Sequence, residues 1–316
     1  MADPKNRNPG HPYTVHWHVG EARVIACETC GFNHVDPIPD TKQLAEFYQK
    51  QYYQQVKPFD YRQVTEEYVQ KQAQQAEKSE YFGNIRAKLA AHLDNTMEEP
   101  RALLDIGCGN NLLSVHFLRQ GWRCKVVEPN TEAADYLRKF GLEVEERFVD
   151  DLSFLDSETF DVVNMQFVLE HLINTIDVLR EAWRVLKPGG LVRVCVPNDF
   201  SEGQLAYCEY HRHDGYPWLQ LPDHINYFNF DSLHRLLARC GFQEVHRTTN
   251  FPLEFLLLGG IDYYRNKEDQ PKVKPFVNNF QQAFIKTGRR DMLDRLYEAL
   301  AQLGMGRAVY MIAKKN

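Results

Sequence analysis

The sequence of 316 residues lacks the features that mark several classes of protein. No apolar run approaches the ~20 residues that a membrane-spanning helix needs. Residues 1–10 are polar and lack the apolar core of a signal peptide. The seven cysteines, an odd number scattered along the chain, favour reduced thiols over a disulfide framework. These absences predict a soluble, cytoplasmic protein without a membrane partner.

A basic excess is also missing. The chain has 37 Lys and Arg and 43 Asp and Glu, which gives a formal net charge of −6. Electrostatic binding of nucleic acid is therefore not expected. Apolar residues make up 43% of the chain, which is enough for a full core and too many for a disordered chain. At ~150 residues per domain, the length fits about two domains or one domain with insertions.

Two zones precede the main domain. Residues 1–40 predict a small β-element, with strands at Tyr13–Val19 and Arg23–Ala26. Residues 41–98 are polar and rich in Gln, and their apolar side chains recur at helical spacing. We expect this second zone to form helices that act as a separate segment or lid.

Strands and helices alternate in the third zone, residues 99–316. This alternation predicts an α/β fold in which a mostly parallel, Rossmann-like sheet is covered by helices on both faces. Insertions at 198–229 and 251–305 interrupt the alternation, and insertions of that size often carry substrate recognition.

The strongest chemical signal is the segment 103–112, Leu-Leu-Asp-Ile-Gly-Cys-Gly-Asn-Asn-Leu. An apolar strand runs into Gly107 and Gly109 and then into a helix, so the backbone can approach a ligand at the strand's carboxyl end. The second strand ends at Glu128, 23 residues after Asp105. That spacing suits an acid that binds ribose hydroxyls.

Two nucleotide cofactors fit such a loop differently. A dinucleotide fingerprint has a third glycine where this chain has Leu112, because the pyrophosphate sits against the helix N-terminus. S-adenosylmethionine (SAM) has no phosphate and does not need that glycine. Its charged end is an amino acid, which Asp105 and the nearby backbone could hold.

At this point the chain resembles the class I SAM-dependent methyltransferases, over about residues 100–250. The resemblance implies their fold, SAM as the cofactor and methyl transfer as the activity. A departure is Asn111, where the family often has a third glycine, but Asn tolerates left-handed backbone. Further family motifs follow in order at Phe160–Val163, Phe167–His171, Leu186–Gly190, Val196–Asn198 and Gly241–Phe242.

The resemblance also implies a set of SAM-binding residues. The glycine loop would lie under the methionine part, and Glu128 would bind the ribose. The turn after the third strand would flank the adenine, with Asp151 as the alternative to Asp150. Residues after the fourth strand would close the pocket or pack in the core. The set comprises Asp105, Gly107, Cys108, Gly109, Glu128, Val149, Asp150, Gln166 and Phe167.

Methyl transfer to a hydroxyl needs alignment, exclusion of water and a general base. His224, in the 198–229 insertion, is our first candidate for the base, and His171, at the carboxyl end of the fourth strand, is the second. Either histidine could instead cap or pack. Tyr227 could hydrogen-bond the acceptor or pack, and Asp223, next to His224 on an extended chain, would face away from it.

A separate motif, Cys27-Glu28-Thr29-Cys30-Gly31, follows the second strand of the β-element. His16 and His18 share one face of the preceding strand. Together these four residues predict a structural Cys₂His₂ zinc site, with His34 as an alternative ligand. Some superfamily members that act on nucleotide-linked sugars carry a similar Cys-x-x-Cys-Gly, but this chain lacks a second Cys-x-x-Cys. A metal-free hairpin with two thiols is the alternative.

The preferred function is therefore SAM-dependent O-methylation of a small polar molecule, such as a sugar, a sugar nucleotide or a secondary metabolite. A non-catalytic SAM-binding or scaffolding subunit is one alternative. An NAD-type oxidoreductase is the other, disfavoured by Leu112. The sequence contains no motif that indicates an oligomeric state or the acceptor atom.

Overall fold

The computed structural model describes residues 10–19, 22–39, 59, 61, 64–93, 99–149, 152–212, 215–219 and 221–316. The chain divides into two compact units. We call residues 39–194, 237–245 and 312–316 the loop unit, since they contain the glycine loop. Residues 1–38, 195–236 and 246–311 form the hairpin unit.

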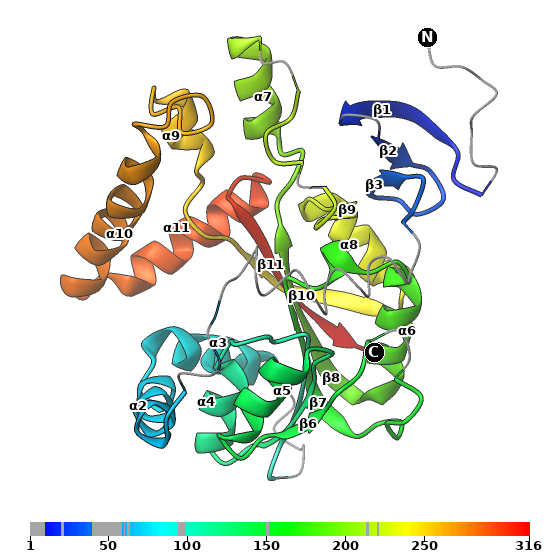
Figure 1. Ribbon diagram of the computed structural model, residues 1–316, viewed down its shortest axis with the longest axis vertical. Coiled ribbons are helices and arrows are strands. Elements are labelled where there is room, and N and C mark those ends of the chain that lie inside the picture. The colour runs from blue at the N-terminus through cyan, green and yellow to red at the C-terminus, as the bar shows by residue number, and fades with distance from the viewer. Residues whose placement is uncertain are drawn as a thin grey trace. The chain divides into compact units, whose positions relative to one another are not determined.

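A seven-stranded sheet has the strand order β10-β11-β8-β7-β4-β5-β6 (Figure 1). Parallel pairing joins β4 to β5 and to β7, and joins β5 to β6. The predicted α/β, Rossmann-like class is confirmed. The strands are β4 (Ala102–Ile106), β5 (Arg123–Val127), β6 (Glu143–Glu145), β7 (Phe160–Gln166), β8 (Leu186–Pro197), β10 (Phe242–Thr248) and β11 (Ala308–Lys315).

Helices connect these strands as the alternation predicts. All five residues of β4 are buried, as expected for a strand covered on both faces. The helix between β7 and β8 buries Val178, Leu179, Ala182 and Val185 along one face. The connecting helices are α4 (Leu113–Arg119), α5 (Thr131–Arg138), α6 (Thr175–Val185) and α8 (Phe230–Arg239), and the short 3₁₀ helix η4 (Leu169–His171) follows β7.

The helical zone before the sheet is described from residue 64 onward, apart from Phe59 and Tyr61. It forms α2 (Glu66–Glu77) and α3 (Glu80–His92), whose N-caps are Thr65 and Ser79. Ala76 and Leu89 are buried in the same apolar cluster as α4. The described part of the expected lid thus packs into the core of the loop unit.

The hairpin unit contains a four-stranded sheet in the order β1-β2-β3-β9. The sequence predicted β1 (Tyr13–Val19) and, as Arg23–Ala26, the middle of β2 (Ala22–Cys27). It did not predict β3 (Asn33–Asp36) or β9 (Asn226–Tyr227), since four and two residues are too short to display an alternating pattern. β9 comes from the first insertion, so a segment distant in sequence completes this sheet.

Both insertions contain helices. The first forms α7 (Glu202–His211), which starts at a capping box of Ser201 and Gln204. The second forms α9 (Glu254–Leu258), α10 (Gln270–Lys286) and α11 (Arg290–Gln302). α10 and α11 pack against each other (Figure 1), and their contact has its own apolar cluster around Phe280 and Tyr297.

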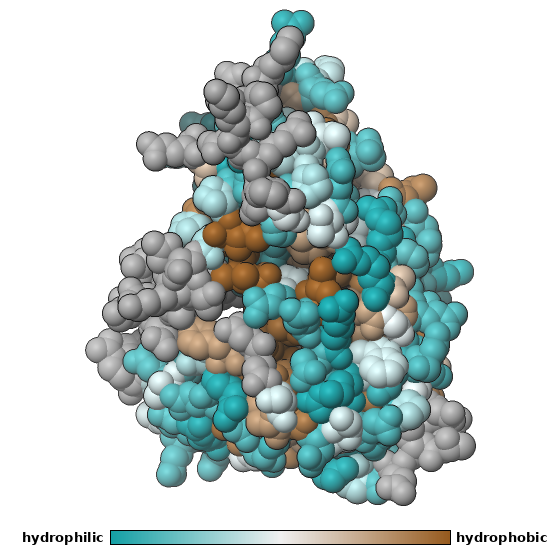
Figure 2. Space-filling model, turned by 90° about the vertical axis from the view of Figure 1, so that its right-hand side faces the viewer, coloured by the Kyte–Doolittle hydropathy of each residue, from teal (hydrophilic) through white to brown (hydrophobic). Residues whose placement is uncertain are grey.

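The exposed side chains and the cysteines are as the composition predicts. Among the coloured residues in Figure 2, hydrophilic side chains predominate, and hydrophobic ones gather near the middle of the view. None of the described helices combines the length and the apolar character needed to cross a bilayer. The seven cysteines, all within the described residues, form no disulfide.

Asn198 anchors the start of the first insertion, immediately after β8. Its side-chain amide donates to the carbonyl oxygens of Gly304 (2.9 Å) and Gly306 (2.8 Å), and its backbone N–H donates to Arg307 O (3.1 Å). The side chain is fully buried. These bonds tie the end of β8 to the loop that precedes β11.

We expect Asn198→Ala to lower the free energy of unfolding by about 1–3 kcal/mol, because a buried carbonyl and a part-buried one lose their donor. Urea denaturation measures the change. The matched control is Asn279→Ala on the exposed side of α10, which should stay within about 0.5 kcal/mol. Equal effects from the two variants would contradict this anchoring role.

Candidate active site

The glycine loop leaves β4 in a conformation that excludes side chains. Gly107 has φ +64° and Gly109 has φ +57°, which is left-handed backbone. A Cβ at Gly107 would come within 2.9 Å of Val168 Cγ2. The loop therefore exposes backbone rather than side chains next to the end of β7, which is the arrangement that a close-fitting ligand requires.

Glu128 fixes this loop from the neighbouring strand. One carboxylate oxygen accepts from Gly109 N–H (2.9 Å) and the other from Asn130 N–H (3.0 Å). The side chain is buried, with 2% of the residue exposed. An ionised carboxylate has about four acceptor positions, so Glu128 can hold the loop and still accept bonds from ligand hydroxyls.

Asp105 acts as an internal brace. It accepts from Ser114 Oγ (2.5 Å) on α4 and from Asn164 Nδ2 (2.6 Å) on β7. Burial raises the pKa of Asp105, and these two hydrogen bonds act against that rise. Arg193 continues the network, donating to Asn164 Oδ1 (2.6 Å) and to Gln166 Oε1 (3.0 Å). Four elements are thus fixed around the loop by buried polar contacts.

The remaining expected cofactor residues occupy different environments. Phe167 has φ +57°, a strained backbone for a bulky residue and a frequent sign of a functional position. Val149 and Cys108 are buried, and burial raises the pKa of the Cys108 thiol. Asp150 and its alternative Asp151 lie outside the described residues.

Tyr61 is a neighbour of Glu128 that the sequence did not reveal. Its ring packs against Phe59 and Tyr136. Burial raises the pKa of Tyr61, and the negative charge of Glu128 adds to that rise. Tyr61 is one of several tyrosines in the Gln-rich zone and no sequence signal sets it apart, so only the folded chain brings it to the carboxylate.

The two candidate bases belong to different units. His171 ends η4 in the loop unit, where its N–H donates to Val168 O (2.9 Å). His224 belongs to the hairpin unit, and its Nε2 lies 3.7 Å from Asp223 Oδ2. The expectation that Asp223 faces away was wrong, because residues 221–223 form a turn rather than extended chain. Tyr227 is buried, and its hydroxyl donates to the carbonyl oxygen of His224 (2.9 Å).

Asp199 is a second residue that the sequence analysis missed. It directly follows Asn198, is 2% exposed and lies 3.5 Å from Arg307 Nη1. Burial raises the pKa of Asp199 to about 6, against the opposing effect of Arg307. A carboxyl group with that pKa can exchange a proton near neutral pH. The signal available in the sequence was an acid just beyond the carboxyl end of a buried strand.

The expected metal ligands do not all come together. His16 and His18 contact each other on β1, with ring centroids 5.0 Å apart, and pair with Ile25 and Arg23 on β2. Cys27 pairs with Tyr13, three residues before His16. At ~3.3 Å per residue, His16 and His18 lie too far along the ladder to share an ion with Cys27. The cysteines lie instead with His11 and His34.

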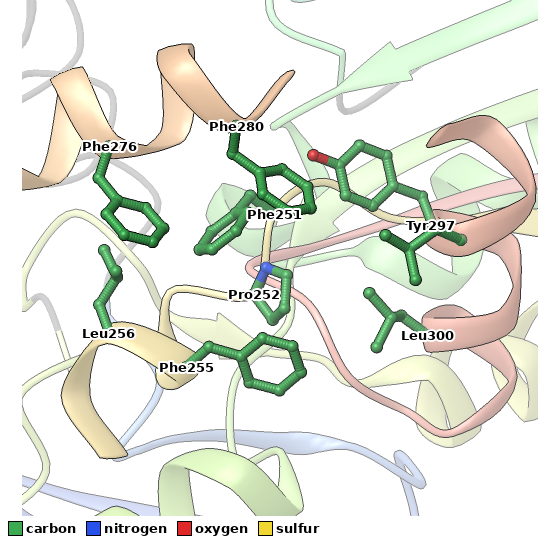
Figure 3. Close-up of a pocket in the computed structure, with 9 residues that line it drawn as sticks. Phe251, Pro252, Phe255, Leu256, Phe276, Phe280, Tyr297 and Leu300 are labelled. Carbon is green, nitrogen blue, oxygen red and sulfur yellow. The ribbon is translucent and has the colours of Figure 1, made fainter. Parts of the chain in front are cut away.

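An apolar pocket of about 370 Å³ lies within the hairpin unit. Figure 3 shows aromatic rings from α9, α10 and the segment before α9 facing into it, with Tyr297 at one side. The Tyr297 hydroxyl accepts from Gln281 Nε2 (3.1 Å). The lining residues are Phe251, Pro252, Phe255, Leu256, Phe276, Phe280, Leu296, Tyr297 and Leu300.

Comparisons with known proteins agree with this arrangement. A family model described as "Methyltransferase domain" matches residues 75–247. The ubiquinone biosynthesis O-methyltransferase of Ruegeria pomeroyi is 30% identical over 175 residues, covering 52% of this chain and 70% of that protein. The protein of the same name from Rhizobium etli is 31% identical over 124 residues, covering 36% and 50%. The chain thus spans about half the length of some of these relatives.

Solved structures give a looser likeness. A Burkholderia thailandensis 1,6-didemethyltoxoflavin-N1-methyltransferase has a TM-score of 0.48 at 15% identity, covering 95% of this chain and 98% of that chain. A SAM-dependent methyltransferase from Archaeoglobus fulgidus has a TM-score of 0.47 at 18% identity, covering 87% and 100%. Scores this low say nothing about the acceptor.

The family match covers more than half of the chain and includes the glycine loop, Glu128 and the end of β7. It is the same region in which buried carboxylates fix a backbone that must remain free of side chains. The chain belongs to the methyltransferase domain family.

Proposed function

We propose that this chain is a SAM-dependent methyltransferase that acts on a hydroxyl oxygen of a small molecule, and that His224 is the general base. SAM supplies a methyl group that its sulfonium already activates. The chain's own work is therefore to hold the cofactor, align the acceptor, exclude water and remove the hydroxyl proton. Family membership favours this function over the oxidoreductase alternative.

The loop unit offers the cofactor groups. Glu128 is the residue that we assign to the ribose hydroxyls, and the backbone of Gly107 and Gly109 lies under the methionine part. Cys108 belongs to the same loop. The buried bonds of Asp105 support a bracing role rather than direct contact. Val149, Asp150, Gln166 and Phe167 remain the proposed walls of the adenine and sulfonium region.

The hairpin unit offers the acceptor groups. As the acceptor oxygen takes the methyl group from the sulfonium and a neutral thioether remains, its proton must leave. The observation that carries the assignment is the pairing of His224 with Asp223, whose side chains lie 3.7 Å apart and are each 12% exposed. A carboxylate beside an imidazole stabilises the imidazolium that forms. Tyr227 supports the position of His224 through the hydrogen bond to its carbonyl.

The role of Glu128 is testable by binding. We expect Glu128→Ala to weaken SAM affinity roughly 10- to 150-fold, because a charged acceptor of hydrogen bonds is lost, and Glu128→Gln to fall between. Isothermal titration with SAM measures this. Glu143→Ala is the matched control, an acid with a 64% exposed side chain on the next strand. Unchanged affinity in Glu128→Ala would remove the assignment.

The base is testable by turnover, followed as S-adenosylhomocysteine formed from an accepted hydroxyl substrate. We expect His224→Ala to slow turnover ~10²–10⁴-fold while SAM affinity and melting temperature stay near wild type. His171→Ala is the parallel variant. If only His171→Ala is inactive while it stays folded and binds SAM, His171 rather than His224 is the base. If both variants remain active, neither histidine is the base.

The pH dependence of the rate tests Asp199 as an alternative base. A carboxylate with a pKa of about 6 accepts a proton only above that pH, so a rate that depends on it rises through pH 6 and levels off. If such a rise survives in His224→Asn and disappears in Asp199→Asn, the base is Asp199. Inactivity of the wild type towards a broad panel of hydroxyl acceptors would favour the non-catalytic, SAM-binding alternative.

A second candidate acceptor is favoured by the pocket in Figure 3. Its lining is almost entirely apolar, whereas a sugar would need several polar partners. The relatives named as ubiquinone biosynthesis O-methyltransferases point in the same direction. An aromatic hydroxyl compound with an apolar substituent would bury that substituent in this pocket and leave its hydroxyl for methylation.

A panel that contains an alkylated catechol and a sugar nucleotide distinguishes the two acceptors. If the catechol is methylated, we expect Phe280→Ala to raise its KM about tenfold, because apolar contact is lost at ~25 cal/mol per Å², with little change in kcat. Leu303→Ala, which is 69% exposed and outside the lining, is the control. Methylation of the sugar nucleotide alone would support the polar acceptor.

A further inference from the structure

Four potential metal ligands meet at the end of the β1–β2 hairpin. His11, Cys27, Cys30 and His34 each offer one ligand atom, and these atoms all lie within 4.8 Å of one another. His11 Nδ1 is 3.4 Å from Cys27 Sγ and 3.5 Å from Cys30 Sγ. A tetrahedral zinc ion, with Zn–S of ~2.3 Å and Zn–N of ~2.0 Å, sets nitrogen and sulfur about 3.5 Å apart. The two distances from His11 Nδ1 to the thiols thus match the nitrogen–sulfur separation of a tetrahedral zinc site.

The backbone holds the cysteine pair in a turn shaped for a shared ion. Cys30 N–H donates to Cys27 Sγ (3.3 Å), and Gly31 N–H donates to Cys27 O (2.9 Å). Glu28 N–H donates to Pro12 O (2.9 Å), which holds the segment beside His11 against the same turn. Hydrogen bonds of this kind around a metal ligand orient it toward the ion.

His34 is oriented as a ligand. Its Nδ1 lies 2.7 Å from the backbone carbonyl of Val35, so Nδ1 carries the proton and Nε2 presents a lone pair. Nε2 is buried and has no hydrogen-bond partner among the described residues. Metal-bound histidines commonly donate their other ring N–H to a carbonyl in this way. A buried nitrogen of this kind needs a partner, and an ion between the two thiols would supply one.

We propose that His11, Cys27, Cys30 and His34 bind one zinc ion, and that this ion braces residues 224–228 of the hairpin unit, which we call the acceptor segment. Two sulfur and two nitrogen ligands suit Zn²⁺, and four protein ligands leave no open position, so the ion is structural. Binding replaces the two thiol protons, which pass to solvent. The ligand set differs from the one that strand alternation suggested, since His16 and His18 are not part of it.

The bracing role follows from the strand that carries His34. β3 pairs with β9, with His34 opposite Asn226, and Val35 N–H donates to Ile225 O (2.9 Å). Phe32 packs on Phe228, with ring centroids 4.9 Å apart. Residues 225–228 follow His224 directly, so an ion that fixes β3 also fixes the segment that presents His224. This second part rests on the proposed function, whereas zinc binding does not.

Metal analysis of the wild-type protein, purified without chelators, tests the site directly. We expect one zinc per chain. Protein in which cobalt replaces zinc should show the visible bands of tetrahedral cobalt and a thiolate-to-cobalt charge-transfer band. A wild type that contains no zinc, and takes up neither zinc nor cobalt when they are added, overturns the proposal without reference to any variant.

Variants identify the ligands. Cys30→Ser and His11→Ala should lose the ion, whereas His16→Ala and Cys208→Ser, matched residues outside the cluster, should keep it. Loss of zinc in His16→Ala with retention in His11→Ala would overturn the ligand set. The variants that lose zinc should also melt about 5 °C or more lower than the controls.

Hydrogen exchange tests the bracing role independently of catalysis. Removing zinc with a chelator should speed exchange of the backbone amides of 33–36 and 225–228. SAM affinity should stay unchanged, because the glycine loop has none of these ligands. If zinc binds but does not slow exchange at residues 225–228, the zinc site stands and its bracing role is overturned. This outcome does not depend on the identity of the acceptor or the base.

Discussion

The contact between the Glu128 carboxylate and the N–H of Gly109 is the constraint on which the cofactor side depends. A loop with two left-handed glycines has few side-chain contacts of its own and would otherwise sample many conformations. The carboxylate joins the loop to the end of β5 and, through Asn130 N–H, to the start of α5. Positioning thus comes from one buried charge that ties three backbone segments together, and the proposed function assigns the ligand hydroxyls to the same charge.

Asp105 extends this principle through the sheet. Its bonds to Ser114 and Asn164, and those of Arg193 to Asn164 and Gln166, connect β4, α4, β7 and β8 below the loop. Burying two charges and an amide is costly unless every partner is present. The network therefore specifies one arrangement of four elements at the edge where the glycine loop lies, and a displaced strand would leave charged atoms without partners.

The sequence predicted the features that depend on short, continuous stretches of the chain. The α/β class followed from alternating patterns, and the glycine loop and the position of Glu128 followed from spacing along one strand–loop–helix–strand unit. The two-residue strand β9 and the proximity of Tyr61 to Glu128 could not be predicted, because each depends on contacts between residues far apart in the chain. Asp223 was misplaced for a local reason. Neighbouring side chains point to opposite faces only on an extended chain. The turn at residues 221–223 instead brings the Asp223 carboxylate to 3.7 Å from His224 Nε2.

The register of the β1–β2 pairing determines which histidines lie beside Cys27 and Cys30. Period-two alternation correctly put His16 and His18 on one face, where their rings touch, but it does not fix where along the hairpin that face meets the cysteines. The pairing of Tyr13 with Cys27 does, and it puts the segment before β1, which carries His11, beside the thiols. The fourth ligand then comes from β3, the strand that also pairs with the acceptor segment. A shift of the ladder by one residue would turn each strand's side chains to the other face, so the same register determines both the metal ligands and the support of His224.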